Sequence, residues 1–257
     1  MSEYLEELEA TMNRGIEFMT LGDFRQALDC FLTVLDSGHM VSPALFEVRW
    51  QIKRLSVRYK PTLEEISSRR DKKELELRSG NISRTHLSEY STLNSLLDEE
   101  KRDVELFLEL YGRGVGDDEL FCLISDKVNL LLENQRLDIL GTYLNKIGDR
   151  FCSSAAELEG EVHFPGKHSS DREIEHHTKK VKEHGLATFE IALGCGKTEQ
   201  ADFVMERVFT VLQDLETLKI FLSIAQKFGA KEQQIRLLEI AGELFPENYA
   251  CLSRSLS

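Results

Sequence analysis

Residues that break helices or form strands are scarce in this chain. Its 257 residues include only four prolines and one tryptophan. Alternating runs of Val, Ile and Thr are nearly absent, whereas Leu, Glu, Lys, Gln and Arg are abundant. Because the first group favours strands and the second favours helices, the composition excludes a sheet-rich protein and predicts an all-α fold.

The chain also lacks an excess of basic residues, and its formal net charge is -13. Nucleic-acid binding requires clustered Lys and Arg side chains that neutralise phosphates. We therefore expect no nucleic-acid partner. An acidic surface is compatible with a basic protein partner, although acidity by itself serves solubility.

Signals for secretion, membrane insertion and disulfide bonding are missing as well. No apolar run reaches the roughly 18 residues that a membrane span needs, and the N-terminal MSEYLEELE lacks the charged-then-apolar layout of a signal peptide. The cysteines are odd in number, scattered and never in a C-x-x-C pair, which predicts buried reduced thiols in a cytoplasmic protein without membrane contact. They are Cys30, Cys122, Cys152, Cys195 and Cys251.

The stretch from Thr11 to Asp36 predicts two amphipathic helices joined by a tight turn. Apolar residues recur at three- and four-residue steps on both sides of Gly22, so each helix has one buried stripe. Small and aromatic residues fall at fixed positions where two helix backbones approach closely. They are Gly15, Phe18, Gly22, Phe24, Ala27 and Phe31. This pattern resembles the tetratricopeptide (TPR) unit of about 34 residues.

The C-terminal part repeats this rhythm. A first helix pair turns at Gly196 and has Ala201 where the opening unit has Ala27. A second pair turns at Gly229, 33 residues later, keeps Ala241, and ends at Pro246. The central region matches the TPR unit by helix length only, and its segment 57–94 is similar to uncharacterised bacterial TPR-type proteins, a similarity that transfers no activity.

The resemblance implies a right-handed α-solenoid of antiparallel helix pairs with about 12 helices. We expect an N-terminal TPR-like array over 1–148 and C-terminal TPR-like helix pairs over 171–248. Residues 149–170, with Gly160, Pro165 and Gly166, predict an insertion or linker, and 249–257 a tail. The charge run from Arg69 to Arg78 predicts a solvated helix face.

Two motifs suggest sites but fit them poorly. The segment 194–198, GCGKT, looks like the end of a phosphate-binding loop. That loop needs another glycine five residues before Gly196, where this chain has Ile191, so we interpret the segment as the turn of a helix pair.

Five of the seven histidines lie between His163 and His184. Zinc ligands on a helix need i,i+3 or i,i+4 spacing or a fixed loop, whereas His177 and His184 are two turns apart. No serine or cysteine has the sequence context of a nucleophile. We therefore expect a non-catalytic protein without metal or cofactor, and keep a metal site or an enzyme at this segment as the least favoured alternative.

TPR arrays bind partners in the groove lined by the first helix of each unit, and the resemblance transfers this role to matching positions here. Met12 and Ile16 replace the Lys and Asn of the TPR subset that clamps a terminal carboxylate, so that clamp is absent. The apolar positions of unit one suit an amphipathic helix or apolar peptide, or they pack on a neighbouring helix of the same chain. The groove positions are Glu9, Met12, Ile16 and Met19, then Glu216, Lys219, Ser223 and Gln226.

The favoured function is a protein–protein interaction module, a scaffold that holds a peptide or helix of a partner on its concave face. The alternative is an acidic immunity or regulatory protein that neutralises a basic effector, which the net charge of -13 motivates. Neither hypothesis identifies the partner.

Overall fold

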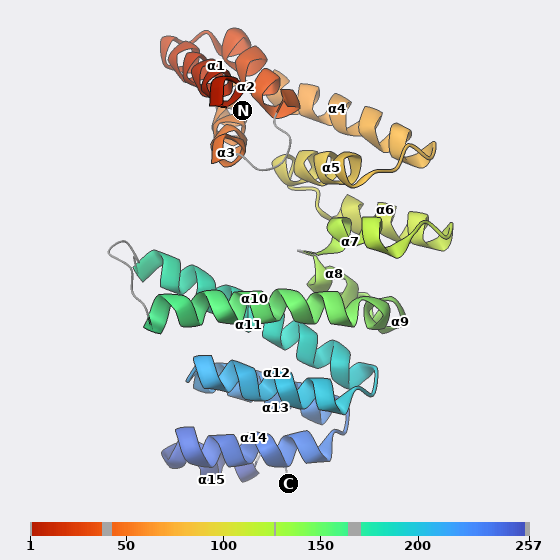
Figure 1. Cartoon of the computed structure of the whole chain (residues 1–257), viewed down its shortest axis with the longest axis vertical. Helices are drawn as coiled ribbons and strands as arrows, with labels where there is room; N and C mark the ends of the chain where they lie inside the picture. The colour runs from red at the N-terminus through yellow and green to blue at the C-terminus, as the bar shows by residue number, and fades with distance from the viewer. Residues whose placement is uncertain (1, 38–42, 126, 164–170, 255–257) are drawn as a thin grey trace. The chain divides into compact units, whose positions relative to one another are not determined.

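The computed structural model describes residues 2–37, 43–125, 127–163 and 171–254. Within these ranges the chain is helical apart from short turns and contains no strand, which confirms the all-α fold. The described residues form fifteen α-helices and one 3-10 helix, more than the expected number. The chain divides into two compact units, Met1–Lys127 and Val128–Ser257, shown in Figure 1.

Unit 1 is built from helices that pack on their neighbours in the chain. The α1 and α2 helices form a tight hairpin, α3 covers it, and α7 packs against both α5 and α6. The elements are α1 (Ser2–Leu21), α2 (Phe24–Ser37), α3 (Pro43–Arg58), α4 (Pro61–Arg78), α5 (Arg84–Leu96), α6 (Lys101–Gly112) and α7 (Asp117–Ile124).

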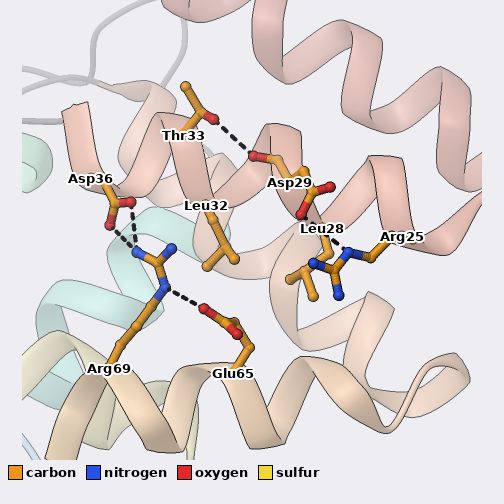
Figure 2. A pocket seen from close by; sticks show the side chains of 8 residues that line it. All are labelled: Arg25, Leu28, Asp29, Leu32, Thr33, Asp36, Glu65 and Arg69. Carbon is orange, nitrogen blue, oxygen red and sulfur yellow. Dashed lines mark hydrogen bonds and ion pairs between the residues drawn. The ribbon is translucent and has the colours of Figure 1, made fainter. Parts of the chain in front are cut away.

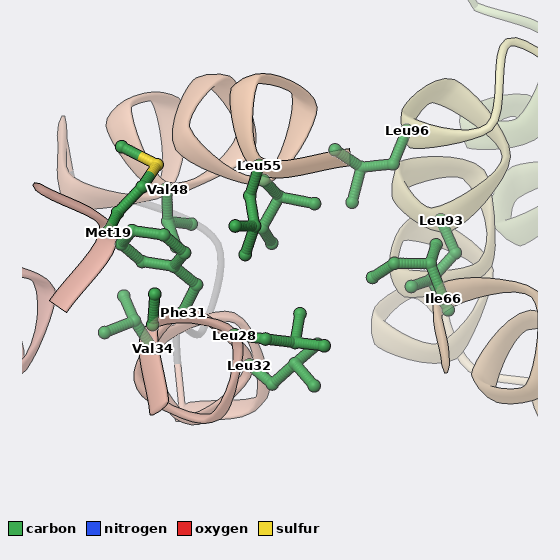
Figure 3. Close-up of a cluster of buried hydrophobic side chains, with 12 residues drawn as sticks. Met19, Leu28, Phe31, Leu32, Val34, Val48, Leu55, Ile66, Leu93 and Leu96 are labelled. Atoms are coloured by element: carbon green, nitrogen blue, oxygen red, sulfur yellow. The ribbon is translucent and has the colours of Figure 1, made fainter. Parts of the chain in front are cut away.

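The core of unit 1 joins α1 to α5 through one cluster of buried apolar side chains, drawn in Figure 3. Phe31 at its centre is fully buried. Leu93 and Leu96 of α5 belong to the same cluster, so helices distant from the opening hairpin share its core. Burial of such side chains stabilises the fold by about 1.5–3 kcal/mol each.

Unit 2 begins with short helices and continues with longer ones. The α10 and α11 helices form its most extensive pair, and α11 also packs against α12 and α13. The elements are α8 (Val128–Glu133), α9 (Leu137–Leu140), the 3-10 helix η1 (Gly141–Tyr143), α10 (Leu144–His163), α11 (Asp171–Gly194), α12 (Thr198–Val211), α13 (Leu215–Lys227), α14 (Lys231–Leu244) and α15 (Pro246–Arg254).

The expected boundaries differ from the observed ones. Residues 149–163 of the expected insertion are helical and belong to α10, and the division between units falls after Lys127 instead. Phe151, Ala155 and Leu158 are buried at four- and three-residue steps, so a regular apolar stripe outweighs the nearby serines and Gly160. Residues 164–170 lie outside the described ranges, and residues 249–254 of the expected tail belong to α15.

One turn geometry ends helices throughout both units. After α1, Gly22 has φ +83°; its amide donates to Met19 O, and the next amide, of Asp23, donates to Phe18 O at 2.9 Å. This pair of bonds is the Schellman motif, which needs a left-handed residue and satisfies the last helix carbonyls. The same two bonds recur at every described residue with positive φ: Gly22, Gly80, Asp98, Gly114, Gln135, Gly196 and Gly229.

The structural positions of the opening hairpin lie where the sequence places them. Ala27 and Phe31 are fully buried, and Gly15 lies beneath the Phe31 ring. A Cβ atom on Gly15 would lie 2.5 Å from Phe31 Cε1, so only glycine allows this approach of α1 to α2. Ala201 and Ala241 are likewise fully buried in unit 2, whereas Pro246 begins α15.

We expect Gly15→Ala to destabilise the protein by about 1–3 kcal/mol, because the added methyl group overpacks the hairpin. The matched control is Gly160→Ala in α10, where a Cβ meets no atom within 4 Å, and where loss of glycine flexibility should stabilise by about 0.5–1 kcal/mol. Urea unfolding measures both. Equal stability of the two variants would contradict the close approach.

Candidate functional site

The second half of the expected partner-binding set lies on α13, whose N-terminus is held by an acidic cap. The Asp214 carboxylate accepts a hydrogen bond from the Thr217 amide at 2.9 Å and pairs with Lys182 Nζ of α11 at 3.1 Å. Hydrogen bonding from Thr217, then the nearby Lys182 charge, lowers the pKa of Asp214. The cap therefore fixes both the start of α13 and its position beside α11.

One face of α13 is buried in an aromatic cluster. Phe221 is fully buried, with its ring centroid 4.5 Å from that of Phe189 on α11 and 5.4 Å from that of Phe209 on α12. Leu218 and Ala225 are fully buried on the same face. Because these contacts come from two other helices, the orientation of α13 in unit 2 is fixed and its opposite face is directed outward.

The outward face of α13 mixes charge with one apolar residue. Ile220 is 46% exposed. Around it lie four exposed residues that the sequence places in the groove: Glu216, Lys219, Ser223 and Gln226. Lys227, one turn after Ser223, is exposed as well. We call these six side chains the α13 face: Glu216, Lys219, Ile220, Ser223, Gln226 and Lys227.

Ion pairs organise the rim of the α13 face. Lys227 Nζ lies 2.6 Å from Glu190 Oε1 of α11, and Lys219 Nζ lies 2.6 Å from Glu216 Oε1. Both pairs are solvent-accessible on the lysine side, so each contributes little to stability. Both lysine ammonium groups and glutamate carboxylates are therefore accessible to a partner.

The first half of the expected set lies elsewhere, in unit 1, and most of it does not line an open groove. Glu9 is exposed, but Met12 and Ile16 pack against the cluster of Figure 3, and Met19 is a member of it with 5% exposure. The cause is α3, which packs against α1 and brings Val48 into the same cluster. These three apolar side chains serve the core.

A polar pocket of about 320 Å³ lies between α2 and α4, as Figure 2 shows. Its two guanidinium groups already have carboxylate partners. Arg69 bonds to Asp36 at 2.5 Å and to Glu65 at 3.1 Å, and Arg25 pairs with Asp29 at 3.5 Å. With three carboxylates and two guanidinium groups that are both paired, the pocket offers no unpaired guanidinium group to a ligand.

Two of the three histidines of α11, His177 and His184, contact α10 at separate points. His177 Nδ1 lies 3.2 Å from Glu157 Oε2, and His184 Nδ1 lies 2.9 Å from Ser154 Oγ. In the described ranges no three His, Cys, Asp or Glu side chains are placed to hold a metal ion. The side chain of His163, and all of His168, lie outside the described part of the chain.

Four cysteines, Cys30, Cys122, Cys152 and Cys195, are free thiols, and burial raises the pKa of each. The side chain of Cys251 lies outside the described part of the chain. A raised pKa lowers the thiolate fraction and with it the reactivity. The GCGKT segment is a helix-pair turn, as expected, because Gly196 has φ +69° and the Lys197 amide donates to Ala192 O at 2.8 Å. That amide is thus committed to the helix end.

No family model, curated protein or solved structure matches this chain. Among the described helices none is long and apolar enough to cross a membrane.

Sequence reasoning missed a cluster of buried charges between α4, α5 and α6. Asp103 is fully buried; its carboxylate accepts from Asn94 Nδ2 at 2.6 Å and from Ser91 Oγ at 3.0 Å. Lys127 Nζ completes the shell 2.8 Å from Asp103 Oδ2. The segment that ends unit 1 is thereby tied to α6 by one ion pair.

The prediction of a solvated face from Arg69 to Arg78 is wrong for two of its residues. Arg70 and Glu74 are only 3% and 6% exposed. Each has a local partner, Asp71 for Arg70 and Arg78 for Glu74, and a second partner distant in sequence: Arg70 pairs with Glu99 at 2.5 Å, and Glu74 with Arg102 at 2.6 Å. Spacing within one helix reveals only i,i+4 partners, so it could not predict these contacts with the start of α6.

Removal of either partner of the Asp103–Lys127 pair should be costly. We expect Lys127→Met or Asp103→Ala to destabilise by about 3–5 kcal/mol, because a buried charge is left uncompensated. The double variant should lose less than the sum of the singles. Chemical denaturation provides the measurement, with the exposed Arg25–Asp29 pair as control: Arg25→Met should cost under about 1 kcal/mol. Additive losses would show that the two charges do not interact.

The Asp214 cap makes a pH-dependent contribution. Because its pKa is lowered in the folded protein, its stabilisation is present above the ordinary aspartate pKa of about 3.9 and is lost as pH falls through the lowered value. We expect Asp214→Ala to cost about 1 kcal/mol at pH 7 and less at pH 3. Urea titrations at both pH values test this, and a constant difference would exclude an ionised cap.

Proposed function

We propose that the protein is a non-catalytic interaction module that binds a helix or peptide of a partner protein on the α13 face. The observation that carries this proposal is Ile220, a large apolar side chain held in solvent on a helix whose other face is locked by Phe221. Protein interfaces have an apolar centre and a polar rim, and the α13 face has this arrangement on a small scale.

A TPR-like arrangement supports the proposal. We infer that α11 to α14 form consecutive helix pairs of a right-handed α-solenoid, because α11 packs on α13 and α12 packs on α14. Gly196 and Gly229 end the first helix of each pair with the same turn. In such an array α13 is a first helix, and its outward face lines the concave side.

The chemistry of the α13 face suggests an amphipathic partner. One apolar side chain would cover Ile220, and groups of opposite charge would meet Glu216 on one side and Lys219 or Lys227 on the other. A helix laid in a groove presents residues with this spacing. The existing rim pairs, Lys219–Glu216 and Lys227–Glu190, would exchange partners at small cost because they are solvent-accessible.

Neutralisation of a basic effector is the second candidate. It rests on the net charge of -13 and on exposed carboxylates such as Glu7 and Glu9 of α1. Such binding is dominated by charge, so its affinity falls steeply with salt. Binding through the α13 face should change less, because contact at Ile220 is apolar.

A photo-crosslinking amino acid at Ser223 tests the proposal in lysate of the source cell. We expect one protein to be cross-linked from Ser223 and not from Glu239, an exposed control position on α14. Mass spectrometry then locates the cross-linked segment, which is synthesised as a peptide. Equal labelling from both positions would count against the α13 face.

Affinity for that peptide provides the sharper test. Ile220→Lys should weaken binding at least tenfold, which corresponds to about 1.4 kcal/mol. Ile235→Lys is the control, because Ile235 is an isoleucine on α14 that is more exposed than Ile220, at 59% against 46%. This variant should bind as the unmodified protein does. If both variants bind the peptide alike, the α13 face is not the site. If, in addition, the unmodified protein loses its affinity at high salt, the neutralising function is indicated.

A further inference from the structure

A second surface in unit 1 combines exposed apolar side chains with positive charge. The α3 helix buries one stripe: Val48 and Leu55 are fully buried and Ile52 is 2% exposed. Tyr59, just after the helix, continues the stripe by packing on Phe24, with ring centroids 6.1 Å apart. These contacts fix which side of α3 is turned to solvent.

The solvent side of α3 is not the polar face that such a helix normally has. Trp50 is 54% exposed and Val57 is 86% exposed, two turns apart on one line. Arg54 lies between them, and its Cζ is 4.4 Å from the centroid of the Trp50 ring. This cation–π contact holds the indole and the guanidinium together as one exposed group.

Most charged side chains around this line are basic, although Glu47, one turn before Trp50, accepts a hydrogen bond from Gln51 at 2.6 Å. Residues 48–63 include five basic side chains and no acidic one, in a chain of net charge -13. Two of the five have other roles: Lys53 bonds to Asp98 at 2.6 Å, and Arg49 to Thr92 Oγ1 at 2.7 Å. Three remain: Arg54, which bonds to the neutral Gln51 amide at 3.3 Å, the exposed Arg58 at the end of the helix, and the exposed Lys60 two residues after it.

We propose that this surface, Trp50, Arg54, Val57 and Arg58, docks an acidic amphipathic helix of a partner protein. The partner would place apolar side chains on Trp50 and Val57, which are about 10 Å apart along the helix axis, and carboxylates on Arg54 and Arg58. Two arginines match the few carboxylates of a short helix and are too few for a phosphate backbone. The acidity of the chain as a whole also disfavours nucleic acid and anionic lipid.

This surface belongs to α3 in unit 1, so it is separate from the α13 face and does not depend on the function proposed there. A partner with an acidic helix would contact the most basic stretch of an otherwise acidic molecule. Charge complementarity would thus direct the partner to α3 and repel it from most other surfaces.

Trp50 is the only tryptophan of the chain, so its fluorescence reports directly on this surface. The probe is a synthetic 18-residue helical peptide with leucines at i, i+4 and i+7 and glutamates on its other positions. We expect a saturable blue shift of the Trp50 emission with a Kd below roughly 0.1 mM. The matched peptide with lysines in place of glutamates should produce no shift.

Two double variants distinguish binding at this surface from a general effect of net charge on affinity. The double variant Arg54→Glu, Arg58→Glu should bind the glutamate peptide at least tenfold more weakly. The control is the double variant Lys197→Glu, Lys231→Glu, which makes the same charge change at exposed sites of unit 2 and should keep the original affinity. Val57→Ser, at a fully solvated position, should also weaken binding without affecting the fold. No shift with the glutamate peptide, equal shifts with both peptides, or shifts only with anionic vesicles or an oligonucleotide would overturn the proposal.

Discussion

The left-handed turn that ends seven of the described helices is the constraint on which the hairpins of both units depend. It stops a helix at a defined residue and starts the next within two or three positions, as at Gly22, so that α1 and α2 form a close hairpin. The turn satisfies two carbonyl groups that a helix end would otherwise leave to water. Close packing such as that of Gly15 on Phe31 follows, because the turn sets the register between the two helices.

The two units hold their helices together by different means. In unit 1 the α4–α6 region relies on buried charges: Asp103 bonds to Asn94 and Ser91 of α5 and pairs with Lys127, and Arg70 pairs with Glu99. In unit 2 the α11–α13 region relies on aromatic rings packed around Phe221, one tilted and one edge-on. Buried charges demand particular partners at particular atoms, whereas aromatic packing tolerates small shifts, so the first arrangement specifies geometry more strictly.

The sequence was sufficient for the helical fold and for the hairpins that end in glycine, because period and turn residues are local signals. It was not sufficient for the unit boundary, since Gly160 and paired serines suggested a break within the continuous helix α10. The burial of Arg70 also escaped prediction, because it depends on Glu99, which is close only in space. At the candidate site, the sequence places Ser223 and Gln226 on an exposed face, but no pattern indicates that α3 covers Met19.

The packing of each helix on helices close to it in the chain has a kinetic consequence. Contacts such as α1 with α2, or α10 with α11, close short loops, so little chain entropy is lost before stabilising contacts form. Proteins with such low contact order fold in microseconds to milliseconds. Helical hairpins would thus be the first structures to form. The apolar stripe that each hairpin leaves exposed would then be the surface on which the next helix packs.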